Sequence, residues 1–387
     1  MANISINRIS EDDFLNMRTT WNDLLERSVT NEFFLLWEWV STWWKSFSNK
    51  NRELYLLLGR NTNGELIGLA PFYLEKNNSP FGTTLRFCSS LETDPDHLDL
   101  ICGPEYTNEF VLAIFAYLAK NKKDWDVIKL EGVKEDSIIN NYVISHEDCL
   151  ENDFIISRLP ESECPCLPIV GSFDTFLKSF SSKQRHNVLR RCKILFENEN
   201  ATLRTSDSPN QFDKDAEEFF KLHIDRAERK GVRTKLSGER IYNFHLSFMK
   251  QLLEHGKIVL CFLYKQSVPL AASYCIKHKG KYYYYQTAVS LEGEEKSAGI
   301  VLLSMMIEKA FEEKYVEFDF LRGGENYKYF WTNKFRMNLS ITIRKKDFMG
   351  ILSSKTMNGY LNFKKLFKLL TKGGNGSEGA DARLCIK

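Results

Sequence analysis

Two stretches of the sequence predict the same succession of secondary-structure elements. In each of them a helix is followed by three consecutive strands, a second helix and a last strand. In the first stretch these elements are expected at residues 33–47, 53–60, 65–74, 84–88, 108–120 and 126–130. In the second stretch they are expected at residues 240–254, 257–264, 269–277, 281–289, 300–314 and 316–321. This internal similarity predicts an α/β (α+β) fold of two tandem units, each a mixed, mainly antiparallel sheet flanked by helices.

Length and local composition place the boundaries between these units. The 387 residues exceed what one hydrophobic core normally serves, so two domains are expected. Residues 159–171 contain three prolines and two cysteines, and residues from 373 onward are rich in glycine and polar side chains. We therefore predict an N-terminal unit over 1–160, a linker over 161–171, a C-terminal unit over 172–347, and a C-terminal helix with a disordered tail over 348–387.

The overall composition narrows the classes of partner. The formal net charge of +2 gives no general reason to expect DNA or an anionic membrane surface as a partner. The nine cysteines are scattered and odd in number, which favours a reducing, cytoplasmic compartment. We find no run of the ~18 apolar residues that a membrane helix requires. The sequence therefore predicts a cytoplasmic protein without membrane insertion.

The start of the predicted helix 300–314 has the features of an anion-binding site. It is preceded by Lys296, Ser297, Ala298 and Gly299. The first backbone N–H groups of a helix have no partner within the helix, and the helix dipole is positive at that end. Glycine places no Cβ in the path of an approaching ligand. We expect this turn to bind a phosphate group.

Polar side chains follow the predicted strand 316–321. Asp319, Arg322, Tyr327 and Lys328 come in quick succession after an apolar segment. Arg322 and Lys328 are suited to gripping a carboxylate or phosphate of a substrate, and the alternative is a structural ion pair with Glu325 or Glu317.

These features resemble a known family. The tandem strand meanders, the Ser-Ser-Lys-Gln-Arg segment 181–185, the helix start 297–299 and the block DFLRGGENYK at 319–328 are similar to those of GNAT acyltransferases. More narrowly, they resemble the CelD-like branch, which occurs in bacterial polysaccharide synthesis and is related to the FemAB peptidyltransferases. The resemblance covers about residues 33–344.

The resemblance implies an N-acyltransferase. It would move an acyl group, with acetyl as the first candidate, from acyl-CoA to an amine of a sugar, an amino acid or a peptide in cell-surface polysaccharide metabolism. The cosubstrate is expected to be acetyl-CoA or another acyl-CoA, held by the C-terminal unit, while the N-terminal unit shapes the acceptor cleft. The expected coenzyme contacts are Gln286, Thr287, Lys296, Ser297, Ala298, Gly299 and Ile300.

The chemistry of amide formation assigns further roles. The attacking amine must lose a proton, and Asp319 is the first candidate for the base, because strand alternation places it opposite Phe318 and Phe320. The alternative is that Asp319 pairs with Arg322 or caps a turn. Backbone N–H groups of a splayed strand at 283–287 are candidates for stabilising the oxyanion.

The expected substrate contacts come from both units. They are Arg322, Tyr327, Lys328, Arg185, His97 and Tyr285. Arg185 lies in a basic segment that is equally typical of a solvated helix face. His97 is either an ordinary surface histidine or a substrate contact from the first unit, and no metal is expected because no second histidine stands at ligand spacing.

Two other functions fit the same residues. Relatives in the FemAB group use aminoacyl-tRNA with a similarly short glycine turn, so transfer of an amino acid from tRNA to an amine is the first alternative. The second is a non-catalytic binding protein of a polysaccharide-synthesis complex.

Overall fold

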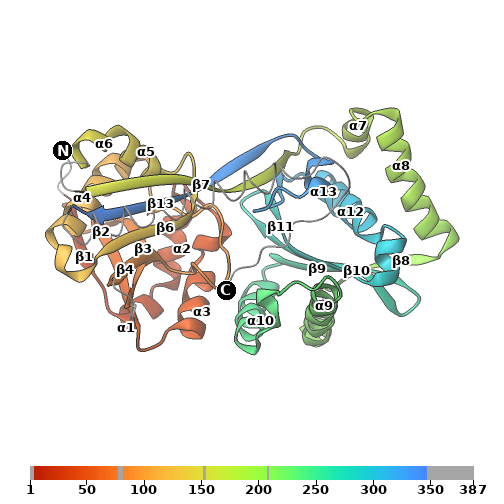
Figure 1. Cartoon of the computed structure of the whole chain (residues 1–387), viewed down its shortest axis with the longest axis horizontal. Helices are drawn as coiled ribbons and strands as arrows, with labels where there is room; N and C mark the ends of the chain where they lie inside the picture. The colour runs from red at the N-terminus through yellow and green to blue at the C-terminus, as the bar shows by residue number, and fades with distance from the viewer. Residues whose placement is uncertain (1–3, 77–81, 151–153, 207–208, 347–387) are drawn as a thin grey trace, which may run out of the picture.

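One continuous sheet runs through the molecule (Figure 1). The structure is a computed structural model, and it describes residues 4–76, 82–150, 154–206 and 209–346. Within these residues thirteen strands form a mixed sheet in the order β1-β2-β3-β4-β6-β13-β7-β12-β11-β10-β9-β8, with β5 paired to β3. The predicted fold class, a mixed α/β fold with helices flanking the sheet, is confirmed.

The repeated order of elements is present in both halves. The first half contains α3 (Trp37–Phe47), β2 (Arg52–Arg60), β3 (Leu66–Lys76), β4 (Thr83–Phe87), α4 (Thr107–Lys120) and β6 (Val127–Lys134). The second contains α10 (Glu239–Leu253), β9 (Ile258–Lys265), β10 (Val268–His278), β11 (Lys281–Val289), α12 (Ala298–Glu312) and β12 (Glu317–Asp319). In both halves the last strand lies parallel to the third strand of the meander, β6 to β4 and β12 to β11. Each half is therefore one copy of the same topology.

The remaining elements extend each half. In the first half they are β1 (Ser5–Arg8), α1 (Glu11–Leu15), α2 (Arg18–Glu26), η1 (Phe33–Leu35), β5 (Ile101–Cys102), η2 (Pro104–Tyr106), η3 (Lys122–Asp124), α5 (Ile138–Ser145), α6 (Glu147–Leu150) and β7 (Phe154–Pro168). In the second half they are α7 (Phe173–Lys178), α8 (Ser182–Lys193), the π-helical turn η4 (Ile194–Asn198), β8 (Ala201–Ser206), α9 (Pro209–Arg229), η5 (Lys235–Ser237), α11 (Leu291–Glu295), α13 (Asn326–Tyr329) and β13 (Phe335–Lys345).

Several of these elements differ from the expectation. Residues 161–168, which the sequence assigns to a linker, form the end of the long strand β7. The segment after β7 forms two helices, α7 and α8, because Ser181 starts a new helix with a capping box to Gln184. Strands β8 and β13 and helix α9 were not predicted. The expected C-terminal helix and tail, 348–387, lie outside the described residues.

The two halves exchange strands at the centre of the sheet. Strand β7 follows the first half in sequence, yet it pairs with β12 of the second half. Strand β13 follows the second half, yet it pairs with β6 of the first. The two exchanged strands also pair with each other over eleven registered positions, from Phe335↔Pro165 to Lys345↔Phe154. In Figure 1 these two strands bridge the two lobes.

Helices cover both faces of the sheet in the second half. Helices α9 and α10 lie on one face of β9 and β10, and α8 and α12 lie on the other (Figure 1). The buried side chains of α12 recur at helical spacing, and examples are Val301, Leu302 and Met306. Burying such side chains contributes about 1.5–3 kcal/mol each. No helix of the described residues is long and apolar enough to span a membrane.

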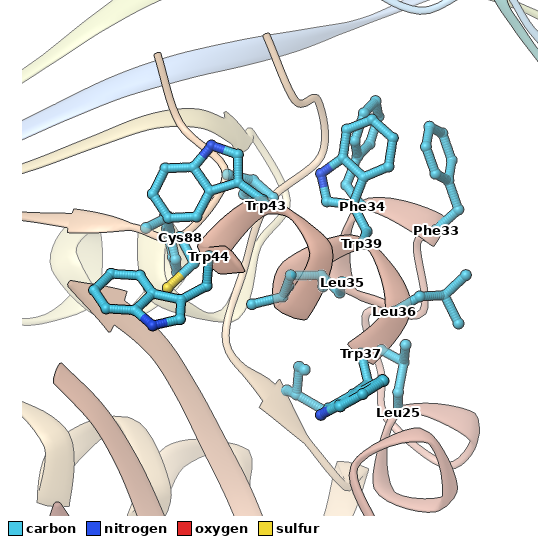
Figure 2. Close-up of a cluster of buried hydrophobic side chains, with 14 of the residues drawn as sticks. Leu25, Phe33, Phe34, Leu35, Leu36, Trp37, Trp39, Trp43, Trp44 and Cys88 are labelled. Carbon is cyan, nitrogen blue, oxygen red and sulfur yellow. The ribbon is translucent and has the colours of Figure 1, made fainter. Parts of the chain in front are cut away.

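Helix α3 carries the aromatic contact between the halves. Figure 2 shows its indole rings directed away from the helix on different sides. Trp43 packs on Tyr73 of β3, with ring centroids 5.1 Å apart. Trp39 instead lies edge-on to Phe244 and Phe248 of α10, at 4.9 and 4.7 Å. Helices α3 and α10, which occupy equivalent places in the two copies, therefore pack against each other.

Candidate functional site

A cavity opens where the parallel strands β11 and β12 separate. Their pairing runs from Lys281↔Glu317 to Tyr283↔Asp319 and stops there. On its other edge β11 stays paired with β10 up to Val289. Residues of β11 beyond Tyr283 therefore have no strand partner on the β12 side. A cavity of about 590 Å³ lies at this divergence, and its wall is formed by β11, the segment after β12, helices α9 and α10, and a loop of the first half.

The wall of this cavity contains six residues that the sequence proposed as contacts, namely Tyr285, Gln286, Thr287, Arg322, Tyr327 and Lys328. It also contains basic and imidazole groups that were not proposed, namely His223, Arg226, Lys230, Arg233, Lys235 and His245. The acidic side chains in the wall are Glu92, Asp94, Asp96 and Glu325. Both halves therefore contribute residues to this cavity. The first half contributes them from residues 92–96, and the expected contact His97 is not among them.

Asp319 is placed away from this cavity. Its carboxylate is fully buried and accepts a hydrogen bond from the Leu321 N–H at 2.8 Å. One of its oxygens lies 3.1 Å from His97 Nε2 and 3.3 Å from Arg336 Nη1. Neither Asp319 nor His97 belongs to the cavity wall. The geometry gives Asp319 a partner in Arg336 and not in Arg322, and it gives neither Asp319 nor His97 a direct route to a substrate.

The electrostatics of this pair fix its charge state. Burial alone would raise the pKa of Asp319, but the His97 and Arg336 charges lower it to about 2. Burial alone would lower the pKa of His97, and the Asp319 carboxylate outweighs this and raises it. The two side chains therefore form a buried ion pair between the first and second halves.

Arg322 is fixed by the loop of the first half. Its Nε donates to Asp96 at 2.7 Å, Nη2 donates to the Pro95 carbonyl at 2.6 Å, and Nη1 lies 3.4 Å from Glu161. The loop can approach because Gly132 has a φ of +69°, and a Cβ there would lie 2.4 Å from the Pro95 oxygen. Neither Glu325 nor Glu317 is its partner. The guanidinium borders the cavity with most of its hydrogen-bonding capacity already used.

Lys328 is mostly buried behind the cavity wall. Its Nζ donates to the Arg322 carbonyl at 2.6 Å and forms an ion pair with Glu325 at 2.9 Å. The pairing with Glu325 is the structural alternative that the sequence left open. Lys328 therefore holds the loop that carries Arg322 and at the same time contributes a positive charge to the cavity wall.

The start of α12 at Gly299 has no side-chain cap, but it lies outside the cavity, and its first residue, Ala298, is fully buried. Ser297 adopts a left-handed conformation with a φ of 59°, and no side chain caps α12. The N–H groups of Ala298 and Gly299 make no hydrogen bond to other described residues. Lys296 is engaged with Glu199 at 2.7 Å, and a Cβ on Gly299 would lie 3.0 Å from Val289 Cγ2. Residues 296–300 are absent from the cavity wall. The close packing against Val289 is a structural explanation for a glycine at position 299, independent of any ligand.

Arg185 is also outside the cavity. It lies on α8, the helix that packs with α12 on the opposite face of the sheet from α9 and α10. The basic segment around it has few buried residues, since Val188 is the buried one within α8. The position favours the solvated helix face that the sequence offered as the alternative.

Two histidines line the cavity between α9, α10 and β11. His223 Nδ1 lies 3.5 Å from Thr234 Oγ1, and its imidazole also hydrogen-bonds with the Gln286 side chain. Burial, reinforced by the Arg226 charge, lowers the pKa of His223 to about 4. Burial lowers the pKa of His245 to about 3. Both imidazoles are therefore neutral at pH 7, so each ring has one nitrogen able to accept a proton.

A signal for His223 was present in the sequence. Phe212, Ala216, Phe219, His223 and Ala227 recur at the helical spacing that marks a buried face, and these positions are buried in α9. A histidine on such a face points into the fold. What the sequence does not show is that this face ends at a cavity rather than in the core.

A second, smaller pocket adjoins the first. It has a volume of about 240 Å³ and shares Asp94, Lys235 and Arg322 with the large cavity. Its other polar lining residues are Ser90, Glu131 and Glu161. Burial raises the pKa of Glu161. Within the described residues no group of three or more histidine, cysteine or carboxylate side chains is arranged to hold a metal ion.

Comparison with known proteins gives a family match for part of the chain and a fold match for most of it. Residues 182–329 match the acetyltransferase (GNAT) domain family, which spans less than half of the chain. No curated protein matches the sequence. The crystal structure of FemX is similar over 87% of this chain and 96% of that chain, with a TM-score of 0.59 and 14% identity.

Two further structures show the same arrangement. A conserved protein of unknown function from Bacteroides thetaiotaomicron is similar over 89% of this chain and 100% of that chain, with a TM-score of 0.54 and 10% identity. L-PGS from Bacillus licheniformis is similar over 84% and 91%, with a TM-score of 0.50 and 12% identity. At these identities the likeness concerns the fold. The chain thus shares the fold of FemX, and its residues 182–329 match the acetyltransferase (GNAT) domain family.

Proposed function

We propose that the protein is an N-acyltransferase that moves an acyl group, with acetyl as the first candidate, from acyl-CoA to a primary amine. The observation that carries this proposal is the cavity of about 590 Å³ at the divergence of β11 and β12. All of its lining residues except those of the loop 92–96 fall inside the segment that matches the GNAT domain. The cavity is lined mainly by polar and charged side chains, with Val232, Leu236 and Phe320 among its apolar lining residues, and it is large enough for part of a small-molecule substrate.

The reaction needs a polarised carbonyl and an acceptor for one proton. The amine nitrogen attacks the thioester carbonyl carbon, the C–S bond breaks, and coenzyme A leaves as the thiol. Backbone groups of β11 beyond Tyr283, which lack a strand partner on the cavity side, are suited to hydrogen-bonding the carbonyl oxygen. The proton lost by the amine is taken up by a neighbouring base and returned to the leaving sulfur.

We assign the role of proton acceptor to His223 instead of Asp319. His223 borders the cavity, and its lowered pKa leaves the imidazole unprotonated at neutral pH. Gln286 and Thr234 orient the ring from β11 and from the segment before η5. The acidic pocket beyond Arg322, with Asp94, Glu131 and Glu161, is suited to attracting a positively charged acceptor amine before it loses its proton.

Acceptors within this proposal are sugars, amino acids or peptides that carry an amine. A role in cytoplasmic steps of cell-surface polysaccharide metabolism follows from the resemblance to the CelD-like branch. The coenzyme diphosphate has two candidate locations, the uncapped helix start at Ala298 and Gly299 and the basic rim of the cavity.

The second candidate is a FemAB-like transfer of an amino acid from charged tRNA. The observation that favours it is the match to the FemX fold, which extends over both halves of the chain rather than over the GNAT segment alone. The same cavity would then receive the aminoacyl ester at the 3′ end of the tRNA, and His223 would serve the same proton transfer.

Ligand-dependent thermal stability separates these functions. A ligand that binds only the folded protein raises the melting temperature, and the stabilisation grows with the logarithm of the ligand concentration above its dissociation constant. We expect acetyl-CoA to stabilise the protein, and release of free thiol in the presence of an amine panel to report turnover. Stabilisation by tRNA without any effect of acetyl-CoA would replace the first proposal by the second. If neither ligand has an effect, the result favours the non-catalytic binding protein over both transferase functions.

A further inference from the structure

We infer that Arg226, Arg229 and Lys230, at the C-terminal end of α9, form a binding site for the phosphate groups of a substrate at the rim of the large cavity. This inference rests on the proposed function only in that a phosphate-bearing substrate enters that cavity. The chemical class is a nucleotide or coenzyme diphosphate. Such a group occurs in coenzyme A and also in nucleotide-activated sugars.

The first observation is the way these three cations share one carboxylate. Glu294 Oε1 lies 3.9 Å from Arg226 Nε, 4.0 Å from Arg229 Nη2 and 3.4 Å from Lys230 Nζ. None of these contacts is at the 2.7–2.9 Å typical of a charge-assisted hydrogen bond. By contrast, Lys235 nearby contacts Asp94 at 2.6 Å. Three positive charges therefore surround a single negative charge at distances that leave room for a larger anion.

The second observation is that donors of this cluster are available. Arg226 Nε is buried and has no hydrogen-bond partner among the described residues. Arg226 and Lys230 both belong to the cavity wall. Arg233 also lines the cavity, is exposed, and makes no ion pair with another described residue. Arg226, Lys230 and Arg233 thus line the cavity, and Arg229 joins the first two around the Glu294 carboxylate.

The helix dipole alone does not account for this arrangement. Cations are favoured at a helix C-terminus, but the Arg229 side chain is directed to β11, where its Nη2 donates to the Val289 carbonyl at 2.7 Å. Arg233 lies beyond the end of α9. Arg226 and Lys230 are one helical turn apart and face the cavity together. The Glu294 carboxylate lies among these cations. A diphosphate bound at the cluster would displace this carboxylate.

The location also fits the proposed reaction. Val289, whose carbonyl Arg229 contacts, ends β11, and its side chain is the neighbour of Gly299 at the start of α12. The cluster and the uncapped helix start therefore lie on either side of the end of β11. A phosphate bound at the cluster would leave the rest of the ligand pointing along β11 toward His223 and Gln286.

The test measures binding of inorganic pyrophosphate, coenzyme A and uridine diphosphate by calorimetry. We expect Lys230→Gln and Arg226→Gln to weaken pyrophosphate binding by about tenfold each. Lys221→Gln, which removes an exposed cation from the same helix outside the cavity, is the matched control and should leave binding unchanged. Glu294→Gln should strengthen binding about three- to tenfold, because it removes the competing carboxylate. Glu295→Gln, with the same change in net charge on an exposed neighbour, should have little effect.

The outcomes separate this inference from the proposed function. If coenzyme A responds to the variants as pyrophosphate does, the site belongs to the donor, and a response of uridine diphosphate alone assigns it to the acceptor. If Glu294→Gln and Lys230→Gln leave the affinities for all three ligands unchanged, the inference is wrong, even if acetyl transfer occurs. If the variants shift pyrophosphate affinity but no acyl transfer is found, the phosphate site stands and the proposed function fails. Both Lys230 and Glu294 are exposed, so these variants should fold even if Arg226→Gln does not.

Discussion

At the scale of single residues, the buried pair of His97 and Asp319 joins positions 222 residues apart. Breaking a buried ion pair costs about 3–5 kcal/mol, and because Arg336 remains 3.3 Å from the Asp319 carboxylate, the loss of His97 should cost an amount near the lower end of this range. We therefore expect His97→Gln to lower the free energy of unfolding by about that amount, measured by urea denaturation. His186→Gln, which changes an exposed histidine on α8, should shift the unfolding free energy by less than about 0.5 kcal/mol. Similar stabilities for both variants would contradict the role of the pair.

The same pair makes stability depend on pH in a defined direction. The lowered pKa of Asp319, about 2, contributes stability that is present above the unfolded value of about 4 and is lost as the pH falls toward 2. The raised pKa of His97 contributes stability that is present below about pH 6.5 and is lost as the pH rises through its folded value. The difference in unfolding free energy between wild type and His97→Gln should therefore be largest between about pH 4 and pH 6.5. A difference that does not vary with pH would show that the contact is not ionic.

The second prediction at this scale concerns His223. If His223 accepts the amine proton, His223→Gln should lower kcat/KM by about 10²–10⁴, while the dissociation constant of acetyl-CoA changes little. Because burial and Arg226 lower the pKa of His223 to about 4, the acid limb of the wild-type pH profile should fall near pH 4. An acid limb near pH 6.5, or full activity of the variant, would exclude His223 as the base. The exposed His255→Gln is the matched control for both measurements.

Individual site residues could be predicted only where local pattern decides their place. Gln286 and Thr287 were expected as coenzyme contacts from the family resemblance and Tyr285 as a substrate contact; all three lie on the predicted strand 281–289, and the structure places them in the cavity wall. The partner of Asp319 could not be read from the sequence, because it depends on how the two halves pack. Alternation correctly separates Asp319 from Phe318 and Phe320, but it does not say whether the opposite side is a cavity or an interface.

At the scale of elements, a pair of glycines sets the distance between α4 and the sheet. Gly59 of β2 and Gly68 of β3 are register partners, and a Cβ on either would lie 2.6 Å from the ring of Phe110. Overpacking of this kind costs about 1–3 kcal/mol. We expect Gly68→Ala to lower the free energy of unfolding by that amount. In the double variant Gly68→Ala/Phe110→Leu, the loss of unfolding free energy should be smaller than the sum of the losses in the two single variants. Strict additivity would show that the Phe110 ring does not limit the spacing between α4 and the sheet.

Elements with regular patterns were predictable, and those that depend on distant partners were not recognised. The meander strands β9, β10 and β11 agree with the expectation within a residue or two at each end. Strand β13 has the apolar residues Phe335, Met337, Leu339, Ile341 and Ile343 in strict alternation, so its signal was available. The segment 161–168 was misassigned because prolines usually interrupt strands. Here Pro165 and Pro168 lie where β7 passes from β13 to β12.

At the scale of the whole molecule, strand exchange decides how the protein unfolds. Each half receives one strand from the other, and β7 and β13 are paired along their length. The repeated order of elements predicts two units, but nothing local in the sequence says that their last strands are exchanged. Buried contacts such as those of Glu32 with Lys281 and Tyr283 add further links between the halves.

Because the halves share strands, we expect them to unfold in one cooperative transition. Six of the seven tryptophans lie in the first half, so tryptophan fluorescence reports mainly on that half, while far-UV circular dichroism reports on the whole chain. Leu303 on α12 is buried in a cluster formed almost entirely by the second half, so Leu303→Ala should destabilise the protein by about 2–5 kcal/mol. If the protein unfolds in a single transition, Leu303→Ala must lower the urea midpoint measured by fluorescence as much as the midpoint measured by circular dichroism. This should hold although the substitution is remote from most of the reporting tryptophans. If the fluorescence midpoint stays at its wild-type value while circular dichroism shows an earlier step, the halves are independent folding units, and the exchanged strands do not couple them.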